Sequence, residues 1–176
     1  ARRVLLSTKK LPPAQKLPQS HRETDLLLAL IEAFKGNGLE SKELAQVGIQ
    51  TGIEIHSPFV EACGWIRMGH AVQLLHKYDS KLAKKCYETA LEIMDQIQVE
   101  RGKAEPLMGL CLLYGCKGEY GRAIEMGMSA LQETEKVEDL WLSSLITLSM
   151  GIASVYNERF EDAMSYLSKA EKMFDE

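Results

Sequence analysis

Small residues recur along this chain at a fixed interval of 40 residues. Ala83, Ala123 and Ala163 form one such series, and a second series with the same interval consists of Ala90, Ala130 and Ala170. A repeat period between 20 and 50 residues is typical of solenoids, in which each helix pair buries its apolar face by stacking on the next pair. The interval therefore predicts a chain built from repeated units and not around one central core.

Apolar residues recur every three or four positions after residue 20, and no segment shows the alternation typical of a strand. The prediction is an all-α protein. Glycines at 36 and 38, the His56-Ser57-Pro58 turn, and Gly115 with Gly118 interrupt the pattern where helices end or begin. With smaller breaks included, eight helices are predicted, at 21–36, 40–55, 58–77, 80–98, 103–116, 119–135, 139–156 and 159–174.

The eight helices group into four antiparallel pairs. Ala45, Ile49 and Gly52 repeat the pattern of the alanine series once more at an offset of 38 residues, which supplies the first pair. Where two helices cross closely, a side chain larger than alanine pushes their axes apart. The expected small contact residues are Gly69, Cys111 and Gly151 in first helices, and Ala83, Ala123 and Ala163 in second helices.

The first 20 residues are predicted to lie outside the repeats. Residues 11–20, LPPAQKLPQS, carry three of the five prolines, which disfavour helix, and the ten residues before them read as the tail of a preceding helix. The repeat domain is predicted over 21–176. Because the chain starts at Ala1 and stops inside a helical pattern, we expect it to be a fragment of a longer protein.

Charge and hydropathy exclude several classes of partner. The net charge of −4 does not provide the attraction for phosphate that nucleic-acid binding needs, so we expect no direct DNA or RNA contact. The apolar run from Leu26 to Ile31 is too short to cross a bilayer, so no membrane association is expected. No Cys-x-x-Cys pair occurs among the four cysteines, which we interpret as reduced core residues of a cytoplasmic protein: Cys63, Cys86, Cys111 and Cys116.

One stretch resembles the tetratricopeptide consensus: Tyr114-x3-Gly118-x-Tyr120-x2-Ala123-x6-Ala130, whose second half recurs from Arg159 to Ala170. The resemblance implies a right-handed superhelical solenoid. The unit here is about 40 residues and not the family's usual 34. This longer unit, with phrases such as SPFVEACGWIRMGHAVQLL and EDLWLSSLITLSMGIASVY, resembles the repeat region of large bacterial transcriptional regulators of the maltose-regulon activator type.

The resemblance implies a segment that binds an inducer, a partner protein or a neighbouring subunit and thereby controls ATPase and DNA-binding domains elsewhere. This chain contains neither the Gly-x4-Gly-Lys-Ser/Thr phosphate loop nor a basic recognition helix, so neither activity is assigned to it. His70 and His76 are six residues apart, which does not place them on one helix face as a metal pair. We expect no catalytic site, cofactor or metal.

In such solenoids the first helix of each pair lines the concave surface, where ligands lie. We predict a mixed polar and apolar groove that binds a peptide, a partner helix or a small effector. Its candidate residues are Ile66, His70, Gln73, Glu105, Met108, Leu112, Trp141, Leu148, Ile152 and Tyr156.

Three functions compete at this level. The leading one is the effector-sensing or protein-interaction segment of a multidomain bacterial transcriptional regulator, without catalysis. The second is a free-standing tetratricopeptide scaffold that binds a peptide or partner protein in its concave groove. The third is a helical enzyme. The apolar ends of a cut solenoid also predict a homodimer.

The alanine series makes a prediction about stability. Replacing Ala123 by Arg should lower the free energy of unfolding by more than about 3 kcal/mol, because it overpacks a close helix crossing and also buries a charge. Thermal unfolding followed by circular dichroism measures the effect. A melting curve unchanged by Ala123→Arg would show that this residue does not lie at a helix crossing.

Overall fold

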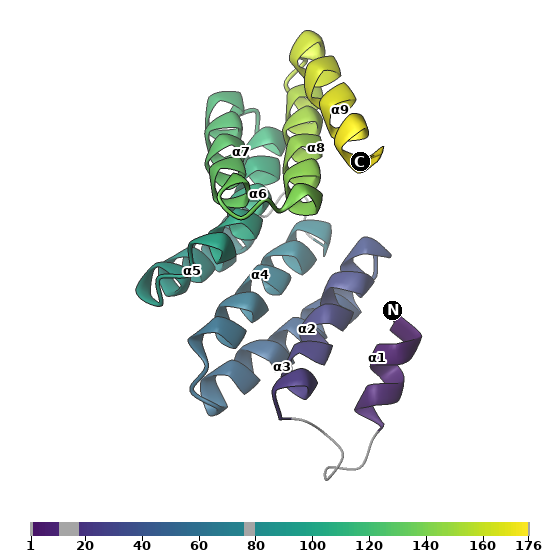
Figure 1. Cartoon of the computed structure of the whole chain (residues 1–176), viewed down its shortest axis with the longest axis vertical. Helices are drawn as coiled ribbons and strands as arrows, with labels where there is room; N and C mark the ends of the chain where they lie inside the picture. Colours follow the sequence, from purple (N-terminus) through teal and green to yellow (C-terminus); the bar gives the residue numbers. More distant parts are fainter. Residues whose placement is uncertain (1, 11–17, 76–79, 176) are drawn as a thin grey trace. The chain divides into compact units, whose positions relative to one another are not determined.

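The computed structural model describes residues 2–10, 18–75 and 80–175, and every regular element in these ranges is a helix (Figure 1). The chain divides into two compact units, Ala1–Ile97 and Gln98–Glu176. Each unit is described below by itself. The repeat domain predicted over 21–176 draws on both units.

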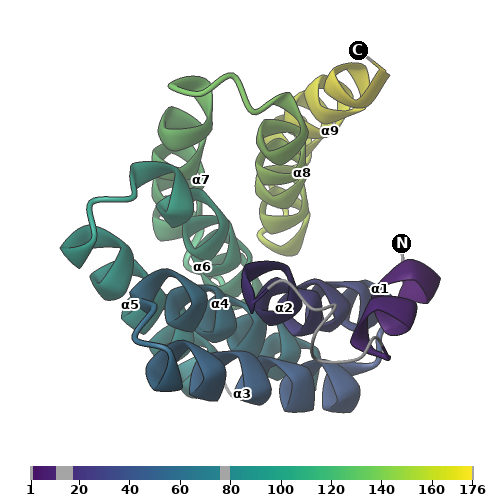
Figure 2. The ribbon, with the colours of Figure 1, turned by 60° about the horizontal axis from the view of Figure 1, so that its bottom comes forward.

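Unit 1 contains five helices: α1 (Arg2–Lys9), α2 (Pro18–Phe34), α3 (Gly38–Glu54), α4 (Pro58–Leu75) and α5 (Ser80–Gln96). Successive helices from α2 to α5 pack against each other, and α2 also contacts α4. Figure 2 shows this layering, with α3 on one side of the unit and α2 and α4 on the other. This is the arrangement of helix pairs in which the first helices of neighbouring pairs touch.

Unit 2 repeats this arrangement with α6 (Ala104–Cys116), α7 (Tyr120–Glu135), α8 (Leu140–Tyr156) and α9 (Phe160–Asp175), preceded by a short 3₁₀ helix, η2 (Glu100–Lys103). Successive helices again pack together, and α6 contacts α8. The element η2 packs on α6 and α7.

Each of the eight predicted helices corresponds to a helix of the structure, and the ends that fall on described residues differ from the predicted ones by at most three residues. The predicted end at 77 lies outside the described residues. The largest difference is at the predicted linker over 11–20, because α2 begins at Pro18 and not at residue 21. Proline fits the first turn of a helix, where its missing N–H has no partner to lose. Residues 11–17 of that linker lie outside the described residues. Helix α1 agrees with the interpretation of the first ten residues as helical.

Among the described residues, a backbone conformation with positive φ follows six of the helices, and its positions are regularly spaced. The residues are Gly36, His56, Gln98, Gly118, Glu138 and Glu158. Positions 98, 118, 138 and 158 are each 20 apart, as are 36 and 56. This 20-residue spacing is half of the 40-residue repeat. Each half of a repeat therefore consists of one helix and the turn that follows it.

Each of these turns closes its helix in a similar way. In five of them, the residue after the positive-φ residue donates its N–H to a carbonyl five positions back, as Glu119 does to Tyr114 at 3.0 Å and Arg159 to Ser154 at 3.0 Å. This bond satisfies a carbonyl at the helix end that has no partner inside the helix. Glycine adopts the conformation without steric cost, whereas His56, Gln98, Glu138 and Glu158 adopt it at a cost of roughly 1–2 kcal/mol each.

Inside the helix pairs, a small residue on one helix faces a large one on the other. A methyl group added at Gly69 would come within 2.5 Å of the Tyr87 ring, and one added at Gly151 within 2.7 Å of Leu167. The same complementarity holds between Gly48 and Leu26. In the α6–α7 pair both contact residues, Cys111 and Gly127, are small, and Met150 of α8 fills the remaining space. The predicted close crossings at Gly69 and Gly151 are confirmed.

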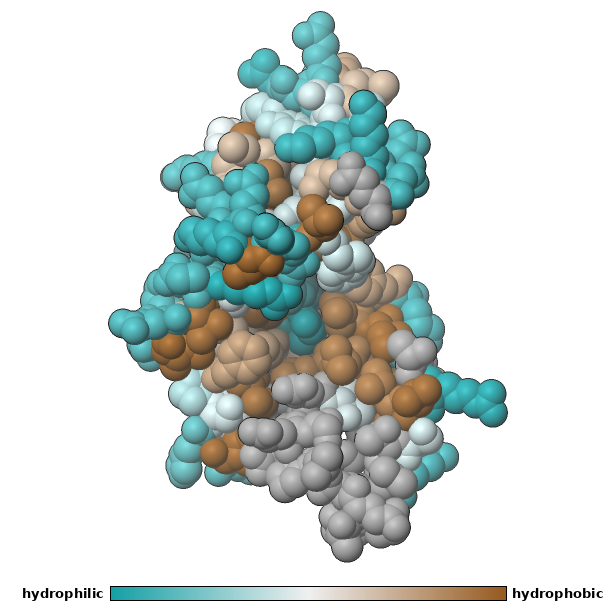
Figure 3. Space-filling view, viewed as in Figure 1, coloured by the Kyte–Doolittle hydropathy of each residue, from teal (hydrophilic) through white to brown (hydrophobic). Residues whose placement is uncertain are grey.

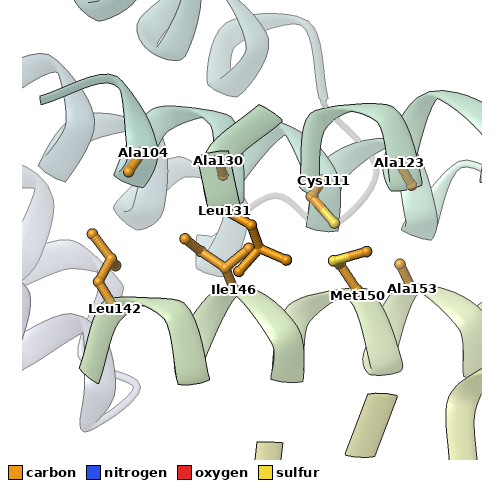
Figure 4. Packing of buried hydrophobic residues seen from close by; sticks show 9 residues of the cluster. All are labelled: Ala104, Cys111, Ala123, Ala130, Leu131, Leu142, Ile146, Met150 and Ala153. Atoms are coloured by element: carbon orange, nitrogen blue, oxygen red, sulfur yellow. The ribbon is translucent and has the colours of Figure 1, made fainter. Parts of the chain in front are cut away.

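The alanines of the two 40-residue series are all buried, as predicted. In unit 2, Ala123 and Ala130 belong to a core formed by α6, α7 and α8, where Leu131 faces Ile146, and Cys111 lies close to Met150 (Figure 4). Ala153 of α8 meets Gly115 of α6 so closely that a methyl group at Gly115 would lie 2.5 Å from its Cβ. The small residues therefore set how near the backbones of α6 and α8 can approach.

The turn conformation can be tested with two glycines that are three residues apart. Gly118 has a φ of +80°, whereas Gly121 lies in α7 with open space around its Cα. Gly118→Ala should lower the free energy of unfolding by about 1 kcal/mol, which lowers the melting temperature by about 2–4 °C.

Gly121→Ala is the matched control, and it should leave the melting temperature unchanged or raise it slightly, because alanine favours helix over glycine. Differential scanning calorimetry of the two variants measures the difference. Equal shifts in both would contradict the role given to the turn at Gly118.

Candidate functional site

Of the predicted groove residues on α4, two contact Tyr87 of α5 and the third is buried. The His70 ring packs on Tyr87, with centroids 5.7 Å apart, and the Gln73 side-chain oxygen accepts a hydrogen bond of 2.6 Å from the Tyr87 hydroxyl. Ile66 is 2% exposed. The physical reason is helical periodicity, since Gln73 lies one turn after Gly69, the residue that touches the Tyr87 ring. A ligand-binding role stays a prediction for these three residues.

The predicted groove residues in unit 2 have mixed environments. Met108 packs partly buried against the core, and the half-buried ones are Glu105, Leu112, Leu148 and Ile152. Trp141 and Tyr156 are 59% and 62% exposed. They lie at opposite ends of α8, about 22 Å apart along its axis, so one small ligand cannot touch both. A role in binding stays a prediction for the residues of unit 2.

A different hollow, of about 500 Å³, opens in unit 2 between α7, the α7–α8 turn, α8 and α9. Its size falls in the range of protein ligand sites. The lining residues come from four separate segments and are Leu131, Thr134, Glu135, Glu138, Asp139, Leu140, Ser143, Lys169 and Met173. We take this hollow as the candidate site.

The hydroxyls at this site are buried and satisfied. Ser143 donates a hydrogen bond of 2.7 Å to the Thr134 hydroxyl, which itself donates to the Leu131 carbonyl at 3.0 Å. Buried polar groups with partners of this kind hold their side chains in one geometry. This pair therefore ties α7 to α8 and makes the hollow a rigid feature of unit 2.

Asp139 holds the turn that forms one edge of the hollow. One of its oxygens accepts the Leu142 N–H at 3.1 Å, which caps the start of α8, and the other pairs with the Arg101 guanidinium of η2. An aspartate at this position satisfies an N–H group that the first turn of a helix leaves without a partner. Both carboxylate oxygens of Asp139 are therefore engaged.

Three other charged groups line the hollow without being engaged. Within the described part of the chain, no hydrogen bond or ion pair involves the side chains of Glu135, Glu138 or Lys169. Glu135 is the last residue of α7, Glu138 lies in the turn that follows it, and Lys169 lies on α9 one turn before Met173. With Asp139 neutralised by Arg101, two carboxylates face one ammonium group across the hollow.

Periodicity alone did not predict this hollow. The hollow depends on how the faces of α7, α8 and α9 meet. A local signal exists for part of the lining, since Lys169 and Met173 share one face of α9.

The consensus tyrosine at 120 is structural. Its hydroxyl donates to the Asp162 carboxylate at 2.8 Å and lies 3.3 Å from the Ser154 hydroxyl. The Arg159 guanidinium lies over its ring, 5.5 Å from the centroid. These contacts join α7, α8 and α9, and burial raises the pKa of the Tyr120 hydroxyl, with the Asp162 charge contributing in the same direction.

The cysteines differ from each other in their surroundings. Cys86 and Cys111 are fully buried, and burial raises the pKa of their thiols to about 11 and about 12. Cys63 is half-buried and Cys116 is exposed. The prediction that all four are core residues is right for Cys86 and Cys111 and wrong for Cys116.

Two further features bear on the site's chemistry. Among the described residues, no three His, Cys, Asp or Glu side chains lie together as a metal site. In the same part of the chain, none of the helices combines the length and the apolar character needed to span a bilayer. Figure 3 shows a largely hydrophilic surface over the region of α7, α8 and α9, interrupted by brown hydrophobic patches.

No family model and no curated protein matches the chain. Among solved structures, the fold is similar to that of BtubC (BKLC) from P. vanneervenii, with a TM-score of 0.65 and 19% sequence identity. The likeness covers 99% of this chain and 70% of that one. At this level of identity, it shows that the two proteins share a fold.

The thiols give a prediction that depends on their pKa values. The thiolate is the reactive form, so in the native protein at pH 8 iodoacetamide should modify Cys116 first and leave Cys86 and Cys111 unmodified. Mass spectrometry of the digested protein identifies the modified residue.

Unfolding in guanidinium should expose all four thiols to the reagent, which controls for intrinsic reactivity. Modification of Cys111 in the native protein at the rate of Cys116 would contradict the packing of α6 against α7 and α8 described above.

Proposed function

We propose that this chain is a helical-repeat binding module, which serves as the effector-sensing or protein-interaction segment of a multidomain bacterial transcriptional regulator and performs no catalysis itself. The observation that carries the binding role is the hollow of unit 2, which combines apolar walls with charged groups that the described residues leave unengaged. Convergent polar groups in a largely apolar hollow are typical of a binding site.

Exposed aromatic and apolar side chains extend the surface around this hollow. Trp141 lies at the start of α8, and Phe174 follows Met173 at the end of α9. Aromatic residues are enriched in protein interfaces because they bury a large area at a small entropic cost. This setting favours a macromolecular partner or a peptide over a small ligand enclosed on all sides.

We further propose that the four helix pairs form one right-handed superhelical solenoid. The equal 20-residue spacing of the positive-φ turns within each unit and the buried alanines in both units support this arrangement. In a solenoid each pair contacts only its neighbours, so a ligand that bridges adjacent pairs changes their relative orientation. Such a change is a means of transmitting binding to other domains.

The assignment to a transcriptional regulator rests on the sequence resemblance, and the free-standing scaffold is the alternative. Both proposals place the protein in the cytoplasm, where thiols such as Cys116 stay reduced. They differ in what lies beside the repeats in the gene. A regulator requires an ATPase or a DNA-binding domain in the same polypeptide, whereas a scaffold does not.

Two measurements test the proposal. Sequencing the complete reading frame should reveal an ATP-binding or helix-turn-helix domain, and a reading frame without either would leave the scaffold. A thermal-shift screen of sugars, amino acids and nucleotides on the full-length protein should find an effector. At a concentration 100 times its Kd, such an effector adds about 2.7 kcal/mol of stability, or roughly 5–10 °C in melting temperature.

A further inference from the structure

We infer that the hollow between α7, α8 and α9 takes up a basic side chain, arginine or lysine, from an apolar segment of a partner protein. The inference rests on the proposed binding function and adds to it the chemistry of the partner. It follows from the charge and the wall composition of one hollow in unit 2.

The walls suit the alkyl stem of a long basic side chain. Leu131 of α7, Leu140 of α8 and Met173 of α9 line the hollow from three helices. Arginine and lysine bury their methylene groups against apolar surface while the charged head stays among polar groups. Methionine adapts its shape to such a stem because its chain is unbranched and flexible.

The charges favour a cationic head group over an anionic one. Glu135 is the last residue of α7 and Glu138 lies in the turn just after it, close to the helix end at which the dipole favours a positive charge. Lys169 is the only positively charged residue that lines the hollow. Arg101 pairs with Asp139 but is not one of the lining residues. The carboxylates at this edge therefore exceed the cations available to them.

The α7–α8 turn already binds one guanidinium of this protein. Arg101 comes from η2, 38 positions before Asp139, and pairs with it at the edge of the hollow. A carboxylate and a guanidinium match in geometry as well as in charge. A second basic side chain would meet Glu135 and Glu138 in an equivalent manner on the other side of the turn.

The segment that carries the basic residue should itself be apolar. Leu140 lines the hollow and is 56% exposed, and Phe174, which directly follows the lining residue Met173, is 45% exposed. The volume of about 500 Å³ exceeds that of one side chain, which leaves space for an apolar neighbour of the basic residue. The occupant is therefore a short segment in which one basic residue lies between aliphatic residues.

The experiment uses four fluorescein-labelled peptides that differ at one central position. The peptides have the sequence Gly-Ser-Ala-Leu-X-Leu-Ala-Ser-Gly, with Arg, Lys, Met or Glu at X, and fluorescence anisotropy measures their affinity for the full chain up to roughly 1 mM. We expect the Arg and Lys peptides to bind and the Glu peptide to bind more weakly than the Met peptide.

Variants then assign the binding to the hollow. Glu135→Gln with Glu138→Gln should weaken the Arg peptide about three- to tenfold, whereas Lys169→Gln should strengthen its binding. Glu125→Gln with Glu161→Gln changes the net charge equally, on exposed parts of α7 and α9 outside the lining, and should leave the affinity unchanged. Circular dichroism confirms that each variant folds.

Three results would overturn the inference. They are tighter binding of the Glu peptide than of the Arg peptide, equal effects of the two double variants, and no binding of any peptide. A natural effector or partner that binds the full-length protein equally well with and without Glu135→Gln and Glu138→Gln would leave the proposed function standing and remove only this inference.

Discussion

The close approach of helix backbones is the constraint on which the other features of this structure depend. Gly69 meets the ring of Tyr87, and Gly151 meets Leu167, so that in these two pairs a small residue interlocks with a large one. A methyl group at either glycine would lie less than 3 Å from the opposing side chain. Because interiors pack at crystal-like density, this spacing leaves no freedom to shift one helix against its partner. The position of every surface feature on a pair follows from these contacts.

The turns impose a second constraint, on length. Among the described residues, the left-handed positions 36 and 56, and 98, 118, 138 and 158, are 20 apart and end their helices at equivalent points, so the small and large contact residues stay in register. Four of the six left-handed residues are not glycine, and each carries a steric cost that the neighbouring hydrogen bonds and packing offset. The regular interval is therefore maintained by tertiary packing as well as by the residue at the turn. In the α7–α8 turn, the same geometry places Glu138 and Asp139 at the edge of the candidate site.

The candidate site shows where reasoning from periodicity stops. The buried alanines and the helix ends could be predicted because they depend on spacing along one helix. The contacts of His70 and Gln73 with Tyr87 could not be predicted in this way, because neighbouring faces of a helix differ by only one residue in the pattern, and contacts with α5 decide which face is covered. The hollow of unit 2 joins Leu131 to Met173 across three helices, and no single helix carries its signal. Electrostatics adds to this difficulty, since Asp139 is engaged by a residue 38 positions away while Glu135, in the preceding turn of α7, is not.

The sequence by itself determined that the chain is helical, where the described helix ends lie to within three residues, and which alanines are buried. These properties could be predicted because helical periodicity, glycine turns and residue size act over short distances along the chain. Only the tertiary structure decided which tyrosines and glutamines are bound to each other, which of the four cysteines is exposed, and which charged side chains face a hollow without an ion partner. These properties depend on the angle and distance between helices that are far apart in the sequence. A change of a few ångströms in one crossing would leave the sequence pattern intact and remove the site.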